Sequence, residues 1–323
     1  MLMSPLSVAQ YLEATGNVDH LFDVILMDEA SQIPVWDAVG SMARAKQVII
    51  VGDPKQLPPT NFFNSATAES VDDGGFETLE SILDEAMAAG LPTLSLKWHY
   101  RSRFESLIAF SNHSYYDGEL VTFPSPITPD TAVSLRYVPG VYDRGGSRTN
   151  QAEAQAVADY VYEHYSDPAR RNKTLGVVAF SQAQETMIMD LIEAKQMQNP
   201  SFVEACEASE QEPLMVRNLE AVQGDERDVI LFSVGYGPDA EGRVSMNFGP
   251  LNRNGGERRL NVAVSRARYE MIIFSSLRYD PIDLNRTSAI GVKSLKRFLD
   301  FAEKGERLNR ERQLAMSKDA SIE

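Results

Sequence analysis

The sequence lacks the residues and segments that several functional classes require. It contains a single cysteine, Cys206, so no intrachain disulfide can form, which fits a reducing compartment. Its longest apolar runs have the length of a strand, far below the roughly 18 residues that a membrane span needs. The first residues show no basic region followed by an apolar core, so no signal peptide is evident. We therefore expect a cytoplasmic, monomeric protein without a membrane partner.

Basic residues are also scarce. Lys and Arg number 31 against 46 Asp and Glu, which gives a net charge of −15. This balance argues against a surface that coats nucleic acid non-specifically, but it allows a protein that holds one strand in a local groove. The 4 histidines and the lone cysteine show no metal-ligand spacing.

Short apolar runs rich in Val and Ile alternate with segments of helical periodicity. This alternation is typical of a parallel α/β sheet, and 323 residues suffice for two domains. Strands are expected near 23–28, 47–51, 93–96, 133–138, 174–179, 213–217, 228–234 and 270–275. Helices are expected near 35–43, 77–88, 103–113, 151–165, 182–197, 257–268 and 291–303. Capping boxes pair Ser102 with Glu105, Asn150 with Glu153, and Ser181 with Gln184.

Two acids follow the first expected strand. Its apolar residues end in Asp28 and Glu29, and ligands of open α/β sheets gather at the carboxyl ends of strands. Asp28 would hold Mg²⁺ through water, because Mg²⁺ keeps much of its hydration shell. Glu29 would polarise an attacking water. The alternative is a solvated strand end, which is common for an isolated acidic pair.

The next expected strand leads into a loop with the sequence GDPKQLPP. Gly52 permits an unusual backbone angle, and the prolines stiffen the end of the loop. Gln56 supplies an amide beside the carboxylate strand, which suits a sensor of a γ-phosphate. A proline-stabilised turn without function is the alternative for the loop alone. Two adjacent strand ends of this content favour the functional interpretation.

The expected helix 257–268 combines an apolar stripe with exposed arginines. The stripe consists of Leu260, Ala263, Val264 and Ala267. Arg266 lies well off this stripe, on the side shared with Arg259. A guanidinium held on a rigid helix suits an arginine finger, which stabilises the charge on a transferred phosphoryl group. A surface ion pair is the alternative.

These segments stand in the order of the motifs of superfamily 1 helicases, in the branch of the nonsense-mediated-decay and replication-associated helicases. Motifs II and III are matched by DEASQ and GDPKQLPPT. Motifs IV, IVa, V and VI resemble LSLKWHYRS, VVAFSQAQ, VRNLEAVQGDERDVI and RRLNVAVSRARYEMIIF. The opening MSPLSVAQYL resembles the nucleic-acid-contacting motif that precedes motif II. The resemblance covers roughly residues 3 to 280.

The resemblance implies an α/β fold of the RecA-like P-loop NTPase type. Residues 1–91 would form the C-terminal part of a first RecA-like domain, and 92–304 a complete second domain with a mainly parallel sheet. Residues 305–323 would be a charged tail.

ATP and Mg²⁺ are the cofactors that the resemblance implies, with ATP bridging the two domains. The first domain would contribute Asp28, Glu29 and Gln56, and the second would contribute Arg101 and Arg266 as γ-phosphate arginines. In motif V, Gly224 would allow close approach of the backbone and Glu226 would bind the ribose. A solvated turn is the alternative for this part of motif V.

Single-stranded DNA or RNA is the partner that the resemblance implies. The positions matching the strand path in relatives are Ser4, Pro5, Pro59, Thr60, Asn218 and Gln223, the last of which would also couple nucleotide to strand. Trp98, His99 and Tyr100 are aromatic candidates for base stacking, and packing in the core is an equally good interpretation of them.

One part of the family pattern does not occur in these 323 residues, namely a Gly-x-x-x-x-Gly-Lys-Ser/Thr phosphate loop. We therefore expect an N-terminal P-loop segment of the same parent protein as a partner, and little ATP hydrolysis by this chain alone. The leading hypothesis is an ATP-dependent helicase or translocase, represented by its motif II to VI portion. An ATPase-dead nucleic-acid- or protein-binding module and an ATPase that remodels proteins are the alternatives.

Overall fold

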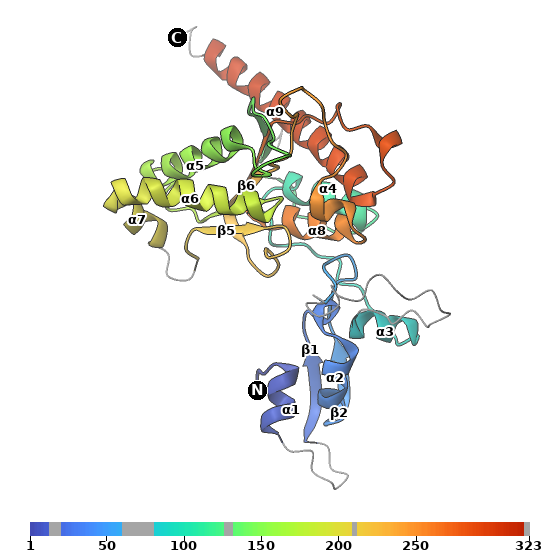
Figure 1. Ribbon diagram of the computed structural model, residues 1–323. Helices are drawn as coiled ribbons and strands as arrows, with labels where there is room; N and C mark the ends of the chain where they lie inside the picture. The colour runs from blue at the N-terminus through green and yellow to red at the C-terminus, as the bar shows by residue number, and fades with distance from the viewer. Residues whose placement is uncertain (13–20, 60–80, 126–131, 209–211, 320–323) are drawn as a thin grey trace. The chain divides into compact units, whose positions relative to one another are not determined.

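The computed structural model describes residues 1–12, 21–59, 81–125, 132–208 and 212–319, with side chains up to residue 305 in the last helix. The chain divides into two compact units, Met1–Leu96 and Lys97–Glu323, here called unit 1 and unit 2 (Figure 1). Across the described ranges, every helix is too short or too polar to serve as a transmembrane span.

Unit 1 is built around a two-stranded parallel sheet. Strand β1 (Phe22–Met27) pairs with β2 (Ala45–Ile50), so that Met27 lies opposite Ile50. Both expected strands are thus confirmed. The sheet is accompanied by α1 (Pro5–Tyr11), α2 (Val35–Met42), α3 (Ile82–Ala88) and the short 3-10 turn η1 (Ala30–Gln32). Helix α1 is absent from the sequence expectations, and the first residues of the expected helix 77–88 lie outside the described ranges.

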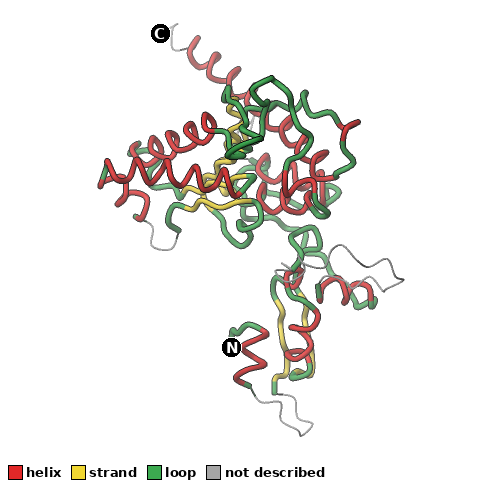
Figure 2. The backbone as a smooth tube through the Cα atoms, in the orientation of Figure 1, coloured by secondary structure: helices red, strands yellow, loops and turns green. Residues whose placement is uncertain are grey.

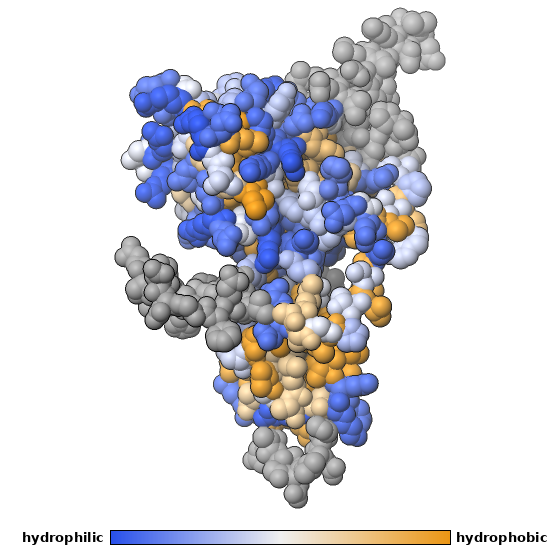
Figure 3. Space-filling view, turned by 90° about the vertical axis from the view of Figure 1, so that its right-hand side faces the viewer, coloured by the Kyte–Doolittle hydropathy of each residue, from blue (hydrophilic) through white to orange (hydrophobic). Residues whose placement is uncertain are grey.

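The core of unit 1 is small. Its buried members are Met27, Ala30, Ala38, Ile82 and Leu83. Several apolar side chains of the sheet remain exposed, including Leu26 and Ile49. In Figure 3, exposed hydrophobic residues appear as orange areas on the face turned toward the viewer. Unit 1 therefore buries much less apolar surface than unit 2.

Unit 2 contains a five-stranded sheet in which every neighbouring pair is parallel, in the order β3-β7-β6-β4-β5. The strands are β3 (Val133–Tyr137), β4 (Leu175–Ala179), β5 (Met215–Asn218), β6 (Arg227–Ser233) and β7 (Ala267–Ser275). All residues of β4 are buried, as a continuous apolar run predicts for a strand covered on both faces. These five expected strands are confirmed.

Helices cover both faces of this sheet, as the tube in Figure 2 shows. One layer consists of α5 (Gln151–Ser166), α6 (Gln182–Gln198) and α7 (Pro200–Glu207). The other consists of α4 (Ser106–Tyr115), α8 (Gly256–Val264) and α9 (Ile290–Asp319). The three layers confirm the expected α/β class with a parallel sheet.

Two of the three expected capping boxes are half confirmed. Asn150 caps α5 and Ser181 caps α6, because each side chain accepts a hydrogen bond from the backbone N–H three residues on. The residue three positions after each cap, Glu153 or Gln184, does not reach back to the backbone of its own cap. Gln184 Oε1 instead accepts a hydrogen bond from the backbone N–H of Asn150. Its Nε2 donates to the carbonyl oxygen of Asn150 and, at 3.1 Å, to Ser233 Oγ.

Glu153 fastens α5 to the carboxyl ends of β6 and β7. Its fully buried carboxyl group accepts hydrogen bonds from Ser233 Oγ at 2.7 Å, Gly235 N at 2.6 Å and Ser276 N at 3.1 Å. Burial raises the pKa of Glu153 from 4.5 to about 7, even though these three donors favour the charged form.

Several sequence expectations are wrong. Residues 93–96 form no strand, and Leu94 and Leu96 are 95% and 87% exposed, because alternation of apolar residues makes a strand only where a neighbouring strand pairs with it. Ser102 caps no helix; α4 begins after Glu105, and Ser102 Oγ lies 2.9 Å from His99 Nε2. Helix α7 was not expected. Helix α9 continues to Asp319, through most of the expected tail.

Glu153→Gln tests the buried carboxyl group. Because the pKa of Glu153 is higher in the folded state than in the unfolded state, its stabilising contribution is fully present below about pH 4.5 and is lost as pH rises through about 7. We therefore expect the stability of the natural protein relative to this variant to fall over that range. Urea denaturation followed by circular dichroism between about pH 5 and about pH 8 measures the difference. Glu193→Gln, on the exposed side of α6, is the control, and a pH-independent difference for Glu153→Gln contradicts the assignment.

Candidate functional site

Two acids of unit 1 stand at the carboxyl end of β1. Glu29 has a left-handed backbone, with φ of 51°, and its N–H donates to Asp28 Oδ1 at 2.9 Å. Both side chains are exposed, and Gln32 Nε2 lies 3.4 Å from Glu29 Oε2. A left-handed residue other than Gly, Asn or Asp is uncommon, and such strain gathers at functional sites. The strand ends as the sequence predicts, with both carboxylates accessible.

The loop after β2 lies directly beside these acids. Ala30 N donates to Val51 O at 2.9 Å, so the two strand ends stay joined beyond the sheet. Gly52 is needed for close approach rather than for an unusual angle, because an added Cβ would lie 3.0 Å from Ser31 N. Gln56 donates its amide to Asp53 Oδ2 at 3.1 Å, which holds it at the same edge as Asp28. The expected neighbourhood of Asp28, Glu29 and Gln56 is therefore present in unit 1.

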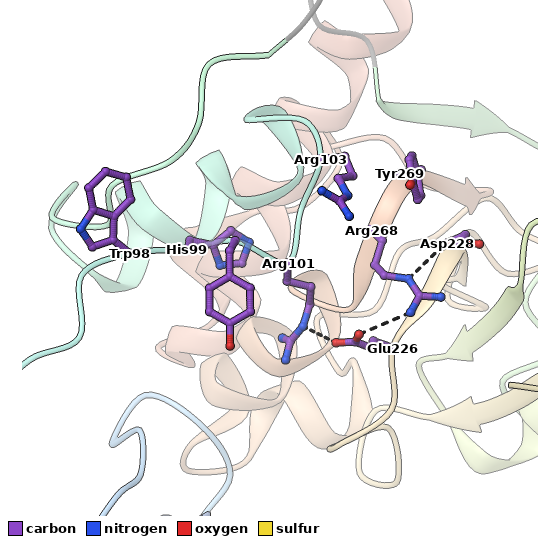
Figure 4. Close-up of a pocket in the computed structure, with 9 residues that line it drawn as sticks. Trp98, His99, Arg101, Arg103, Glu226, Asp228, Arg268 and Tyr269 are labelled. Atoms are coloured by element: carbon purple, nitrogen blue, oxygen red, sulfur yellow. Dashed lines mark hydrogen bonds and ion pairs between the residues drawn. The ribbon is translucent and has the colours of Figure 1, made fainter. Parts of the chain in front are cut away.

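Unit 2 contains a pocket of about 670 Å³ at the amino ends of β6 and β7. It is shown in Figure 4 and is lined by Trp98, His99, Tyr100, Arg101, Arg103, Glu226, Asp228, Arg268 and Tyr269. Arg101 and Glu226 are sequence-predicted site residues that the structure brings together, although 125 positions separate them in the chain. The pocket combines aromatic rings, three guanidinium groups and two carboxylates.

Glu226 lies between two arginines, as the dashed lines in Figure 4 show. Arg101 Nε donates to Glu226 Oε2 at 2.5 Å, and Arg268 Nη1 lies 3.4 Å from Glu226 Oε1. Arg101 Nη1 also lies 3.4 Å from the carbonyl oxygen of Ser265. Because a carboxylate offers about four acceptor positions, Glu226 can still accept a hydrogen bond from a ligand hydroxyl.

Arg268 forms ion pairs with the acidic residues on this side of the pocket. Its guanidinium group bonds both oxygens of Glu212, Asp228 Oδ1 at 2.9 Å and Thr174 Oγ1 at 3.0 Å, besides Glu226. These contacts raise the pKa of Arg268, with the Glu212 carboxylate as the largest cause, and the Arg268 hydrogen bonds lower the pKa of Glu212. The sequence expectations miss Arg268. It lies in motif VI, two residues after Arg266.

Arg266 does not occupy the position expected from a helix through residue 268. Helix α8 ends at Val264 and β7 begins at Ala267, so Arg266 stands in the connection between them. Its side chain is 3% exposed, and its Nε donates to the carbonyl oxygen of Val262 at 2.8 Å. Arg266 is therefore neither on a helix face nor part of the pocket lining. In the sequence, Ala267 continues the apolar spacing of the expected helix. In the structure it is the first residue of β7, and it is buried there as part of the sheet.

The aromatic residues of motif IV are not core residues. Trp98 and Tyr100 are 63% and 80% exposed and line the pocket, which contradicts core packing for both. His99 is more enclosed, and its Nε2 accepts a hydrogen bond from Ser102 N at 3.1 Å. Burial, reinforced by Arg101, lowers the pKa of His99 to about 4, so the ring is neutral near neutral pH.

None of the described residues proposed for the nucleic-acid path is among those that line this pocket. Ser4 caps α1 by accepting from Ser7 N at 3.2 Å, and Pro5 is the first residue of that helix. Pro59 is buried, so its ring is not available for a contact with a strand. Thr60 lies outside the described residues.

Motif V runs from the end of β5 to the start of β6. Asn218 is the last residue of β5, and its Nδ2 donates to Glu185 Oε2 at 2.6 Å. Gly224 has φ of +87°, a backbone angle that favours glycine, and an added Cβ would meet no described atom within 4 Å; its close approach to a nucleotide stays a prediction. Gln223 is partly buried near that turn. The segment thus connects Asn218 at the carboxyl edge of the sheet to Glu226 at the amino edge.

Both units have side chains that suit the implied cofactors. Mg²⁺ prefers one or two carboxylates, with water and substrate phosphates as its other ligands, and Asp28 with Glu29 fits that donor set. No group of three or more His, Cys, Asp or Glu able to hold a metal occurs among the described residues. The unit 2 pocket fits part of a nucleotide, because it offers aromatic faces, a hydroxyl-accepting carboxylate and guanidinium groups.

Comparison with known proteins places the chain in a class. Two family models, each described as an AAA domain, match residues 78–278 and 7–63, which together include both strand-end acids and the unit 2 pocket. The chain belongs, more narrowly, to the superfamily 1 helicases, as the helicase relatives of this region show.

The relatives are much longer than this chain. It is 35% identical over 302 residues to the uncharacterized ATP-dependent helicase MG140 of Mycoplasma genitalium, covering 90% of this chain and 26% of the relative. It is 26% identical over 276 residues to the probable helicase senataxin of Mus musculus, covering 80% and 10%. A solved complex of Arterivirus nonstructural protein 10, a helicase, with DNA shares 14% identity over 77% of this chain and 39% of that one, with a TM-score of 0.36. The chain spans about a quarter of the length of the first of these relatives.

Arg268→Gln tests the importance of the carboxylate cluster. Without the guanidinium group, Glu212, Glu226 and Asp228 lose a shared cation, and we expect the free energy of unfolding of unit 2 to fall by about 2 kcal/mol. Urea denaturation of the full chain measures the change. Lys304→Gln, which removes an exposed pair with Asp300, is the control and should cost less than about 1 kcal/mol. Equal losses in the two variants would show that the cluster contributes no more than a surface pair.

Proposed function

We propose that the chain is the motif II to VI portion of a helicase that couples ATP hydrolysis to movement along single-stranded DNA or RNA. The observation that carries this proposal is the pocket in which Arg101, Glu226 and Arg268 converge from motifs IV, V and VI. Segments far apart in the chain supply guanidinium and carboxylate groups there. Because the chain belongs to the helicase family, ATP is the ligand that we propose for these groups.

In the proposed reaction, unit 1 supplies the groups for hydrolysis. Asp28 would hold Mg²⁺, which when bound neutralises charge on the phosphates. Glu29 would accept the proton of the attacking water and orient it, and its exposed position at the strand end leaves it accessible for this task. Gln56, fixed by Asp53, would sense the γ-phosphate.

Unit 2 would bind the nucleotide from its own side. Glu226 would accept a hydrogen bond from the ribose, and Tyr100 or Trp98 would stack on the base. Arg101 would move from Glu226 to the γ-phosphate, where its planar fork can bond two oxygens. Arg266 would have to leave the Val262 carbonyl to serve as a second γ-phosphate arginine, so its role stays a prediction.

Motif V suits coupling between nucleotide and strand. Asn218 at one edge of the sheet and Glu226 at the other belong to one short segment that turns at Gly224. A shift of Glu226 on nucleotide binding would therefore be transmitted to Asn218 and Gln223, the proposed contacts with single-stranded nucleic acid. Ser4 and Pro5 are the proposed contacts of unit 1. A cytoplasmic location remains part of the proposal.

The test is an ATPase assay of the complete protein that contains this chain together with a phosphate loop. We expect ATP turnover to rise at least about tenfold on addition of single-stranded polynucleotide, as tight coupling of strand binding to hydrolysis requires. Parallel assays with poly(dT) and poly(U) distinguish DNA from RNA as the substrate. Turnover that no polynucleotide stimulates would instead favour an ATPase that remodels proteins.

Glu29→Gln separates hydrolysis from binding in that complete protein. The amide cannot accept the proton of water, so we expect turnover to fall at least about a hundredfold while the Kd for ATP changes little. Steady-state turnover and equilibrium binding of ATP measure the two effects. Glu85→Gln, in α3 of the same unit, is the matched control. A near-normal rate for Glu29→Gln removes this residue from the active site.

A further inference from the structure

Arg103 differs from the other two arginines that line the unit 2 pocket. Arg101 and Arg268 are each bonded to carboxylates, as described above. The Arg103 side chain is exposed, and it forms no hydrogen bond or ion pair within the part of the chain that the structure describes. Figure 4 shows it beside Arg268 and Tyr269. Its charge is therefore not compensated by a neighbouring carboxylate.

The backbone of Arg103 is nevertheless well fixed. Arg103 N donates to the carbonyl oxygen of Arg268 at 2.8 Å, which attaches this segment to β7. Ser102 adds two contacts, because its N–H donates to His99 Nε2 and its Oγ lies 3.4 Å from the carbonyl oxygen of Ala267. A long side chain that leaves a fixed backbone toward a pocket loses less conformational freedom on binding a ligand than one on a mobile loop.

Arg103 also decides the sign of the charge that the pocket presents. Of the charged lining residues, Arg101 and Arg268 are matched by Glu226 and Asp228, and Glu212 behind them offsets Arg268 further. Without Arg103 the lining would be neutral at most, although the whole chain carries a net charge of −15. A lining without excess positive charge would not attract a polyphosphate anion, whereas an uncompensated guanidinium group attracts one at close range in a partly desolvated site.

We propose that Arg103 binds the phosphate groups of the nucleotide in this pocket, in addition to the γ-phosphate contact assigned to Arg101. This inference rests on the proposed function, because it takes ATP as the ligand. The pocket suits a nucleotide, since the aromatic rings, the carboxylate of Glu226 and Arg103 offer one position each for a base, a sugar and a phosphate.

Tryptophan fluorescence provides a local measurement in the 323-residue chain. The sequence has 2 tryptophans, of which Trp98 lines the pocket and Trp36 lies on α2 of unit 1. In a Trp36→Phe background, Trp98 reports binding when the chain is titrated with ATP or with adenosine. Adenosine has the same base and sugar but no phosphate, so it separates the contribution of Arg103 from stacking.

We expect Arg103→Gln to weaken ATP binding about tenfold and to leave adenosine binding unchanged, since one charge-assisted contact is lost. Arg103→Lys should recover part of the ATP affinity, because it restores a point charge without the planar fork. Lys173→Gln is the matched control. Its ammonium group lies 5.1 Å from the centroid of the Tyr269 ring but outside the lining, so its loss should weaken ATP binding less than twofold.

The outcomes separate the two proposals. If the parent chain binds ATP but Arg103→Gln binds it equally well, the role of Arg103 is refuted while the nucleotide site stands. An equal loss of ATP and adenosine affinity also refutes it, because the variant would then have disturbed the pocket as a whole. A variant that loses affinity for a single-stranded oligonucleotide and not for ATP assigns Arg103 to the strand instead. If neither ATP nor adenosine changes the Trp98 signal of the parent chain at millimolar concentration, the nucleotide site itself fails, and the proposal for Arg103 fails with it.

Discussion

The structure of the candidate site depends on the bonds of one guanidinium group, that of Arg268. Its partners are Glu212 before β5, Glu226 in motif V, Asp228 in β6 and Thr174 before β4. A planar group with five donors can satisfy several carboxylates at once, whereas an ammonium group cannot do so with fixed geometry. Through Glu226 the same network reaches Arg101. The amino ends of four strands, β4 to β7, and motif IV are thereby held around one pocket.

The two edges of the unit 2 sheet are stabilised in different ways. At the amino edge, partly buried ion pairs that still reach solvent surround a pocket, so the groups there can exchange partners when a ligand binds. At the carboxyl edge, Glu153, Asn150 and Gln184 form a buried network that leaves little freedom of movement. Motif V connects the edges. This division explains how a rigid sheet can carry a pocket whose ion pairs are able to rearrange.

Expectation and structure differ where a local pattern has two tertiary outcomes. The spacing of Leu260, Ala263, Val264 and Ala267 is helical, yet the chain leaves the helix at Val264 because β6 provides an edge on which β7 can pair. Leu94 and Leu96 alternate like a strand but find no partner. Glu153 and Gln184 occupy capping-box positions, but their side chains serve the interior because the ends of β6 and β7 offer them stronger partners. Competing partners from distant segments are invisible to local periodicity.

The sequence by itself determined the family, the parallel α/β class and the place of Asp28, Glu29 and Gln56 at one edge of adjacent strands. It could do so because continuous apolar runs alternating with helical segments are typical of a parallel sheet, and residues directly after a strand must appear at that strand's end. Only the tertiary structure decided that Arg101 and Glu226 meet, that Arg268 joins them, that Arg266 is buried and that Arg103 is not paired with a carboxylate. Those properties depend on which side chains from separate segments come within a few ångströms of each other, and charge compensation is settled only at that range.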